Sequence, residues 1–319
     1  VMMGDTLSVK VFQALAAALD MAGDRRVILS DRGNFPTDLY MAQGLVDALG
    51  RGHELRLVDP EDVAQAITDD VAAVMLTHVD YRTGRMHDMA HISARAHDAG
   101  AVMIWDLAHS AGAVPVDLAG CGCAFAVGCS YKYLNGGPGA PAFIYVRGDL
   151  ADSVEPILAG WLGHAAPFDF DLGYRPAPGA GRLRVGTPPV MQMTALEAAL
   201  TVWEGVDMSD LRRESMRLQE VFISEIEARV PQLHLASPRD PEARGSQVSF
   251  AYDRGYAAIQ ALIARGVVGD FRAPDLMRFG FTPLYIDEAD VRGAVDHIEA
   301  VIRDRLWDQP EFLARKAVT

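Results

Sequence analysis

The sequence predicts an α/β protein, with a large domain built on a mixed, mostly parallel sheet and a smaller α+β domain after it. Up to residue 146, short apolar runs alternate with segments of helical periodicity, which is typical of a doubly wound sheet. Little helix separates the runs 123–129 and 142–146, so part of the sheet should be antiparallel. Beyond residue 190 the pattern becomes mainly helical. We therefore predict a large domain over residues 1–190 and a small domain over residues 191–319.

Each predicted element rests on its local pattern. Apolar side chains every three or four residues, such as Val9, Phe12 and Leu15, predict the first helix. Pro36 suits the first turn of a second helix, and the many Gly and Pro residues of 151–189 predict a long functional loop. Strands are expected at 26–30, 55–58, 71–76, 101–104, 123–129, 142–146, 247–252 and 277–281. Further helices are expected at 36–49, after 60, at 86–99, at 191–230 with a break near Gly205, before 265 and at 287–303.

Composition limits the classes of function that fit this chain. The net charge of −14 argues against nucleic acid or an anionic membrane as a partner. No run reaches the roughly 18 apolar residues of a membrane span, and no signal peptide is recognisable. Cys121, Cys123 and Cys129 are odd in number and lie close together, which is typical of a reduced, cytoplasmic protein. We interpret them as small buried hydrophobic residues rather than as a metal site.

An acid and a lysine follow two of the predicted buried strands. Asp106 ends the run 101–104, and Lys132 follows the run 123–129 and precedes a glycine-rich turn. Open α/β sheets bind their ligands at this edge, beyond the carboxyl ends of the strands. A partly desolvated lysine has a lowered pKa and can form a Schiff base with an aldehyde cofactor. The alternative is a lysine that only pairs with a nearby acid.

The acid makes the cofactor interpretation stronger. Pyridoxal phosphate requires a lysine for its aldehyde and a carboxylate for its pyridinium nitrogen. Asp106 and Lys132 could serve these two roles from neighbouring strands. The other two lysines, Lys10 and Lys316, are expected to be solvated. So are His87 and His91, an i,i+4 pair for which no third metal ligand is evident.

Several motifs together resemble the kynureninase family, whose members are pyridoxal-phosphate enzymes of fold type I related to the class V aminotransferases. The similarity extends over nearly the whole chain, and its two longest segments contain no gap. It also implies that an amino-terminal segment of the family is missing here. The segments that carry the resemblance are 34–38 (Asn-Phe-Pro-Thr-Asp), 78–84 (His-Val-Asp-Tyr-Arg-Thr-Gly), 86–89, 106–117 (Asp-Leu-Ala-His-Ser-Ala-Gly-Ala-Val-Pro-Val-Asp), 131–139 (Tyr-Lys-Tyr-Leu-Asn-Gly-Gly-Pro-Gly) and 283–285.

The resemblance implies a set of site residues. Pyridoxal 5'-phosphate would form its Schiff base with Lys132, with Tyr131 as proton donor and Asp106 at the ring nitrogen. Arg278 would bind the substrate carboxylate, although an arginine in a strand can instead form a buried salt bridge. The implied cofactor contacts are Leu7, Ser8, Phe35, Pro36, Thr37, Asp38, Thr77, Asp106, His109, Tyr131, Lys132, Trp161 and Thr187. Among them, Ser8 or its neighbour Thr6 can also cap the first helix, whose amino terminus is a natural phosphate seat.

The implied reaction is hydrolysis of L-kynurenine, and more weakly of 3-hydroxykynurenine, to anthranilate and L-alanine in tryptophan catabolism and NAD biosynthesis. The resemblance also implies a homodimer with shared active sites, because Trp161 and Thr187 come from the neighbouring subunit in the family. Thr187 replaces an asparagine and Phe281 a common proline of some relatives, which concerns specificity for the aryl ring. Alternatives are another enzyme of the same fold, such as an aminotransferase or a desulfurase, and a non-catalytic relative. A desulfurase would need a reactive cysteine on a loop, and no cysteine follows Cys129 in this chain.

Overall fold

The computed structural model describes residues 1–315, and the chain divides into two compact units. The first unit comprises residues 1–78, 87–111 and 116–204, and the second comprises 79–86, 112–115 and the chain from 205 onward. The predicted division at residue 190 stays a prediction. Two short excursions of the chain, 79–86 and 112–115, join the second unit and have no counterpart in that prediction.

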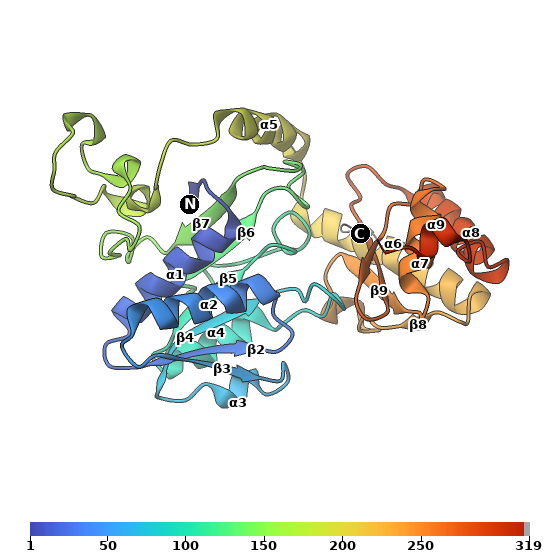
Figure 1. Ribbon diagram of the computed structural model, residues 1–319, viewed down its shortest axis with the longest axis horizontal. Helices are drawn as coiled ribbons and strands as arrows, with labels where there is room; N and C mark the ends of the chain where they lie inside the picture. Colours follow the sequence, from blue (N-terminus) through green and yellow to red (C-terminus); the bar gives the residue numbers. More distant parts are fainter. Residues whose placement is uncertain (316–319) are drawn as a thin grey trace. The chain divides into compact units, whose positions relative to one another are not determined.

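The first unit is built on a seven-stranded mixed sheet with the order β1-β7-β6-β5-β4-β2-β3 (Figure 1). The five neighbours from β3 to β6 are parallel, whereas β7 is antiparallel to both β6 and β1. This confirms a mostly parallel sheet with an antiparallel part. The strands are β1 (Met2–Met3), β2 (Val27–Asp31), β3 (Glu54–Val58), β4 (Val71–Thr77), β5 (Val102–Asp106), β6 (Phe125–Cys129) and β7 (Ala142–Val146).

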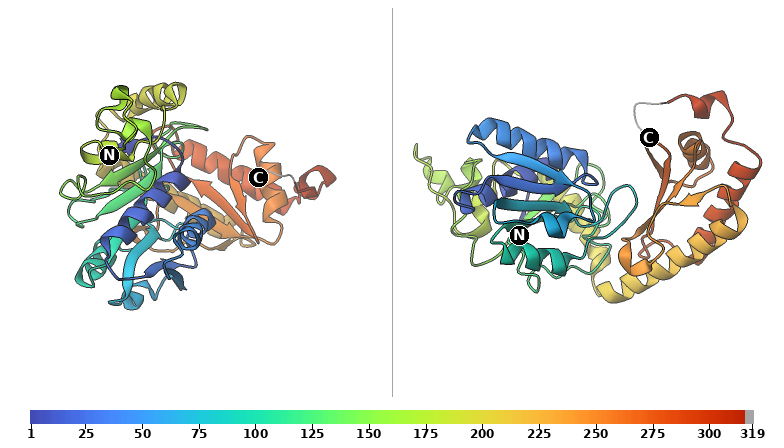
Figure 2. Two further views of the ribbon diagram at one scale, coloured as in Figure 1. Left: turned by 60° about the vertical axis from the view of Figure 1, so that its left-hand side comes forward. Right: turned by 90° about the horizontal axis from the view of Figure 1, so that it is seen from below.

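Helices cover both faces of this sheet, as the two further views also show (Figure 2). On one face, α1 (Leu7–Met21) and α2 (Pro36–Leu49) pack over a core that includes Phe125 and Ile144. On the other face, α3 (Val63–Ala66) and α4 (Met89–Asp98) pack over a core around Trp105. The central strands are buried on both sides, and this explains why their sequences are continuous apolar runs.

The predicted long loop contains short 3-10 helices but no strand of the sheet: η1 (Trp161–Gly163), η2 (Pro167–Asp169) and η3 (Gly179–Leu183). The helix α5 (Val190–Leu200) and the 3-10 helix η4 (Thr201–Trp203) follow. The break expected near Gly205 is confirmed, because the next helix begins at Met208. None of the helices within residues 1–315 is long and apolar enough to cross a membrane.

The second unit contains a four-stranded antiparallel sheet with the order β10-β11-β9-β8. Its core gathers apolar side chains of the sheet and of three helices, and Phe281 lies in it against Phe222. The strands are β8 (His234–Leu235), β9 (Gln247–Ala251), β10 (Asp270–Arg272) and β11 (Leu276–Gly280). The helices are α6 (Met208–Arg229), α7 (Gly255–Ile263), α8 (Glu288–Arg303) and α9 (Pro310–Leu313).

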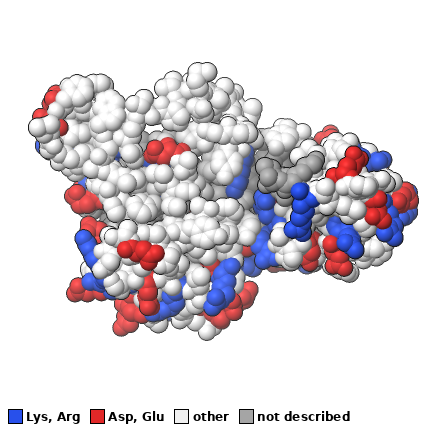
Figure 3. Space-filling model, viewed as in Figure 1, with Lys and Arg blue, Asp and Glu red and all other residues white. Residues whose placement is uncertain are grey.

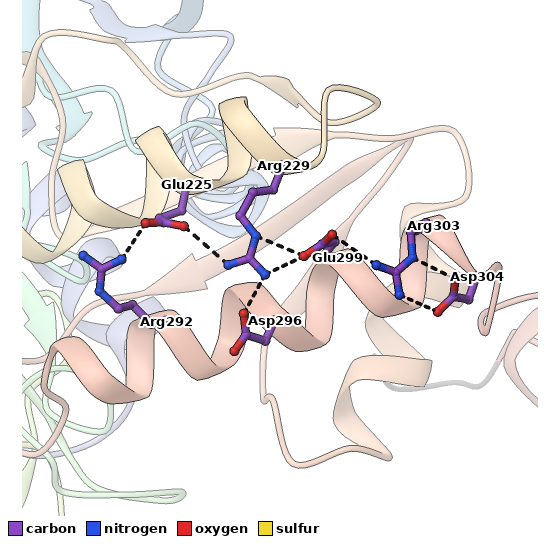
Figure 4. A network of polar contacts seen from close by, with 7 residues as sticks. All are labelled: Glu225, Arg229, Arg292, Asp296, Glu299, Arg303 and Asp304. Carbon is purple, nitrogen blue, oxygen red and sulfur yellow. Dashed lines mark hydrogen bonds and ion pairs between the residues drawn. The ribbon is translucent and has the colours of Figure 1, made fainter.

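A network of ion pairs joins the outer faces of α6 and α8 (Figure 4). Arg229 lies at its centre and contacts Glu299 and Asp296 of α8 at 2.5 and 2.6 Å. Its side chain is 30% exposed. Exposed pairs of this kind contribute little individually, so the network mainly fixes the register between the two helices.

Candidate active site

Three adjacent strands bring the predicted catalytic residues to one edge of the first unit's sheet. Thr77 ends β4 and Asp106 ends β5, and the two residues are paired across the parallel ladder. Lys132 lies three residues beyond the end of β6, the next strand of the sheet. This is the carboxyl edge, where parallel sheets hold their ligands.

Asp106 is a buried carboxylate, 2% exposed. Its Oδ1 accepts a hydrogen bond from the amide of Ala108 at 2.7 Å, and its Oδ2 accepts one from the Thr77 hydroxyl at 3.3 Å. These two donors come from the turn after β5 and from the end of β4. Together they fix the orientation of the carboxylate within the sheet edge.

The start of α2 supplies a second buried acid. Phe35 occupies the N-cap. Pro36 lies in the first turn, as the sequence predicted, and Asp38 follows in the same turn. Asn34 links this turn to the sheet, since its side chain accepts from Thr77 at 2.5 Å and donates to Ser30 at 2.9 Å. The sequence reasoning gave Asn34 no role, although the residue lies within the 34–38 motif.

Asp38 and Asp106 are two buried acids, and burial raises the pKa of both. Burial, followed by the charge of Asp106, raises the pKa of Asp38 well above its usual range. Burial also raises the pKa of Asp106, but the Lys132 ammonium, the Ala108 amide and the Thr77 hydroxyl oppose this shift. Asp38 lacks these hydrogen-bond donors, and its buried Oδ2 has no hydrogen-bond partner within residues 1–315. The pKa of Asp38 is therefore raised further than that of Asp106, which favours the neutral form of Asp38 and the charged form of Asp106.

Lys132 lies between an imidazole and a phenol. Its Nζ is 3.1 Å from Nε2 of His109 and 5.6 Å from the centre of the Tyr131 ring. Tyr131 is 45% exposed, yet burial raises the pKa of its phenol above the usual range, and the nearby thiol of Cys129 adds to this shift. A phenol with a raised pKa keeps its proton at neutral pH and can donate it.

The glycine-rich turn after Lys132 is closely packed. The amide of Gly136 donates to the carbonyl of Ser130 at 2.9 Å, and a Cβ at position 136 would lie 2.7 Å from the Ala140 side chain. Asn135 and Gly137 both adopt positive φ, at 62° and 71°. Glycine, and to a lesser degree asparagine, tolerates positive φ, and this allows the tight turn. The turn reverses the chain direction before β7.

The proposed phosphate seat lies at the start of α1. Leu7 and Ser8 form its first turn, and Thr6 occupies the N-cap without a side-chain capping bond. The expected capping role of a serine or threonine is therefore not realised. Amide groups at the start of an uncapped helix favour an anion.

Trp161 and Thr187 lie in the segment before α5, and both are exposed. Thr187 borders a cavity of about 380 Å³, together with Gly4, Asp5 and Arg184. Thr37, another of the implied cofactor contacts, lies in the first turn of α2.

Arg278 belongs to the second unit. It lies on β11 directly opposite Asp270 of β10, and its Nε donates to Oδ1 of Asp270 at 2.9 Å. Its Nη2 also contacts Asp270, and its Nη1 donates to the carbonyl of Tyr81. The role of Arg278 as a substrate clamp stays a prediction.

Two expectations about solvated side chains are wrong. Lys10 is fully buried, because Asp5, Gln13 and the Leu183 carbonyl accept hydrogen bonds from its ammonium group at 2.9, 3.0 and 3.1 Å. His87 is also buried and lies 2.7 Å from Asp31, whereas His91 is exposed. Each buried side chain has a polar partner: Asp5 and the distant Leu183 carbonyl for Lys10, and Asp31 for His87. The periodicity of the sequence does not reveal such partners. Lys316 lies outside the described residues.

A further polar pair was missed by the sequence reasoning. His78 and Ser110 follow Thr77 and His109 directly, and their side chains are 2.8 Å apart. The His78 ring also packs edge-on against Trp105. The pair joins the turns that follow β4 and β5, and thereby supports the residues beside Asp106.

The residues present fit pyridoxal phosphate. Two buried acids lie near a single lysine, and one of their oxygens has no hydrogen-bond partner within residues 1–315. A protonated ring nitrogen would supply the missing positive charge beside Asp106. Lys132 would hold the aldehyde, and the uncapped start of α1 would accept the phosphate.

The fold is similar to those of solved cysteine desulfurases. The apo cysteine desulfurase from Thermococcus onnurineus NA1 superposes with a TM-score of 0.81 at 20% identity, covering 95% of this chain and 79% of that one. A C-DES mutant with glycine covalently linked to its PLP cofactor gives a TM-score of 0.79 at 19% identity, covering 96% of this chain and 80% of that one. The chain therefore has the fold type I architecture of these proteins.

Sequence relatives narrow this class. Residues 211–298 match the model of the Kynureninase C-terminal domain, and residues 52–124 match that of the DegT/DnrJ/EryC1/StrS aminotransferase family. A kynureninase from Pseudomonas fluorescens is 49% identical over 326 residues, covering 100% of this chain and 78% of the relative. One from Burkholderia mallei (strain SAVP1) is 49% identical over 322 residues, covering 99% and 77%. The chain belongs to the kynureninase family of pyridoxal-phosphate-dependent hydrolases.

Proposed function

We propose that this protein hydrolyses L-kynurenine to anthranilate and L-alanine, with Lys132 as the residue that binds the cofactor. The family assignment supports the reaction, and the contact of Lys132 with His109 beside the buried Asp106 carries the assignment of residues. Pyridoxal phosphate, when bound, supplies an electron sink conjugated to the substrate amine. Such an enzyme would serve tryptophan catabolism and NAD biosynthesis.

The chain's own side chains then perform the proton transfers. Asp106, held by Ala108 and Thr77, keeps its negative charge at the position of the ring nitrogen. Lys132 removes the proton from the substrate Cα once its amine is free. Tyr131 donates a proton at the end that becomes L-alanine, since its phenol stays protonated at neutral pH. Water adds to the γ-carbonyl, and cleavage of the Cβ–Cγ bond releases anthranilate.

A desulfurase activity, suggested by the structural neighbours alone, is not favoured by the thiols. Burial raises the pKa of Cys123 to about 12 and also raises that of Cys129, so neither thiol ionises readily. A persulfide-forming cysteine needs an accessible thiolate. The three free thiols do fit our inference of a reducing, cytoplasmic location.

We also infer a homodimer in which each subunit completes the other's site. The helix α5 is mostly apolar, with Gln192, Thr194 and Glu197 as its polar residues, yet only Leu196 of it is buried, while Val190 and Met191 are 62% and 79% exposed. The surface over α5 is almost entirely without charge in the space-filling view (Figure 3). Phe168 and Phe170, 73% and 74% exposed, extend the apolar surface of the preceding loop. A large exposed apolar surface indicates a protein interface, and Trp161 and Thr187 lie within this region.

The test of the reaction combines a spectrum with an assay. The protein incubated with pyridoxal phosphate should show a visible absorbance band, and it should release fluorescent anthranilate from L-kynurenine. A band without anthranilate would instead support a non-catalytic, cofactor-binding relative.

The dimer can be tested by complementation. A Lys132→Ala variant mixed with a Trp161→Ala variant should regain part of the parent activity, because a mixed dimer contains one intact site. Sedimentation as a monomer at assay concentration, or no regain of activity, would contradict shared sites.

A further inference from the structure

The surroundings of Arg278 form an ordered cluster that the assignments above do not explain. Asp270 and Arg278 are directly opposite on antiparallel strands, and the arginine side chain is only 11% exposed. Asp270 contacts both Nε and Nη2 of the guanidinium, which is the bidentate arrangement. One edge of the guanidinium plane is thereby fixed.

A second arginine shares the same carboxylate. Arg272 lies two residues after Asp270, on the same face of β10, and its Nη2 is 3.3 Å from Oδ2 of Asp270. Burial and the nearby charge of Arg278 lower the pKa of Arg272. Its Nε is buried and has no hydrogen-bond partner within the described chain. Two cations and one anion leave this trio with a net charge of +1, so it should attract an anion.

The segment 79–86 also contacts the Arg278 guanidinium. Its Tyr81 carbonyl accepts from Nη1 of Arg278. Asp80 fixes this turn, since its Oδ1 accepts from the amides of Arg82 and Thr83 at 3.0 and 2.6 Å. The side chain of Gln247 on β9 donates to the Asp80 carbonyl at 3.0 Å, which ties the turn to the sheet of the second unit.

Within residues 1–315, these contacts occupy three of the five N–H donors of the Arg278 guanidinium. An arginine has five N–H donors in a planar fork. Asp270 takes the edge formed by Nε and Nη2, and the Tyr81 carbonyl takes one hydrogen of Nη1. Two donors remain, one on each terminal nitrogen, and together they can bind a second carboxylate end-on.

We propose that Asp270 is a positioning residue that orients Arg278 toward the α-carboxylate of an amino-acid substrate, and that Arg272 keeps the site cationic by sharing the charge of Asp270. This proposal rests on the proposed function, in which Arg278 binds that carboxylate. Without Arg272, the pair of Arg278 and Asp270 would be neutral and would attract an anion only weakly.

The direction in which Asp270→Asn changes carboxylate binding distinguishes a positioning role of Asp270 from a competing role. If Asp270 only occupied Arg278 as an internal competitor, Asp270→Asn would free the arginine and tighten carboxylate binding. If Asp270 positions Arg278, the same substitution loses the fixed geometry and weakens binding. The asparagine side chain has nearly the same size, so packing of the strands is retained.

The experiment compares two ligands that differ only by a carboxylate. Binding of L-alanine and of ethylamine to the protein loaded with pyridoxal phosphate is followed by the change in visible absorbance. The Kd of ethylamine divided by the Kd of L-alanine measures the preference for the carboxylate, and a larger ratio means a stronger preference. We expect Asp270→Asn and Arg272→Gln each to reduce this ratio by about tenfold, the effect of one charged hydrogen bond, with the Kd of ethylamine unchanged. The exposed acid Asp253, replaced by Asn, serves as the control and should leave the ratio unchanged.

Kinetics with L-kynurenine provide a second measurement. Asp270→Asn should raise KM about tenfold and change kcat by less than threefold. An unchanged or increased ratio in Asp270→Asn, or an equal loss of ethylamine binding, would overturn the positioning role. Failure of the parent protein to release anthranilate would contradict the proposed function instead, and the binding ratio would still decide the role of Asp270.

Discussion

The substitution Asp106→Asn tests the electrostatics of the site most completely. Asparagine keeps the size of the side chain and one oxygen, which can still accept from the Ala108 amide, while its NH2 group replaces the oxygen that accepts the longer bond from Thr77. The Thr77 hydroxyl can accept from that NH2 group, so the fold should be retained. It removes the negative charge of a group that is only 2% exposed. Losing one partner of a buried ion pair costs about 3–5 kcal/mol. If the whole cost is felt in the transition state, kcat/KM should fall by about two to three and a half powers of ten.

In the cofactor-free protein, Asp106→Asn should leave the thermal stability unchanged or increase it. Asp106 raises the pKa of the neighbouring Asp38, so the two acids oppose each other in the absence of the cofactor. Thermal unfolding of the cofactor-free variant at neutral pH should therefore occur at or above the parent Tm. Activity would be measured by anthranilate fluorescence, with Asp20→Asn, an exposed acid of α1, as the control. Activity within threefold of the parent would show that Asp106 does not hold the ring nitrogen.

Three further predictions follow from single residues. Arg278→Lys should raise KM for L-kynurenine far more than it weakens cofactor binding, because lysine lacks the planar fork; an unchanged KM would leave Arg278 as a structural ion pair with Asp270. Thr187 offers no amide to a 3-hydroxyl group, so kcat/KM should favour kynurenine over 3-hydroxykynurenine by about 10- to 100-fold at most, and a preference for the hydroxylated substrate would refute this. Asp38 has a raised pKa, so its stabilising contribution is full below about pH 4 and is lost as the pH rises toward the raised value. The Tm of the cofactor-free Asp38→Asn variant should therefore rise relative to that of the parent as the pH increases above about 4, and parallel Tm curves would contradict the raised pKa.

Most of the first unit's sheet could be predicted from the sequence because its strands are buried on both faces. A run such as 71–76 is continuously apolar, and β4 spans Val71–Thr77 in the structure. The short edge strand β8 (His234–Leu235) was missed. Two residues give no periodicity, and such strands form only because a partner strand is already in place.

The site was predicted less evenly. Asp106 and Lys132 were recognisable because each follows a buried strand, and the sheet brings them to one edge. The partners that hold them were not, since Asn34, His78 and Ser110 act through contacts between segments far apart in the sequence. Lys10 shows the same limit, because its acceptor at Leu183 is 173 residues away.

The central claim is that Lys132 binds the cofactor of a kynurenine-hydrolysing enzyme. It is tested most directly by reducing the protein loaded with pyridoxal phosphate with borohydride, digesting it and locating the modified lysine by mass spectrometry. We predict that the pyridoxyl group is found on Lys132, that reduction abolishes the release of anthranilate, and that Lys132→Ala shows neither label nor activity. A label on Lys10 or Lys316, with Lys132 unmodified, would contradict the account.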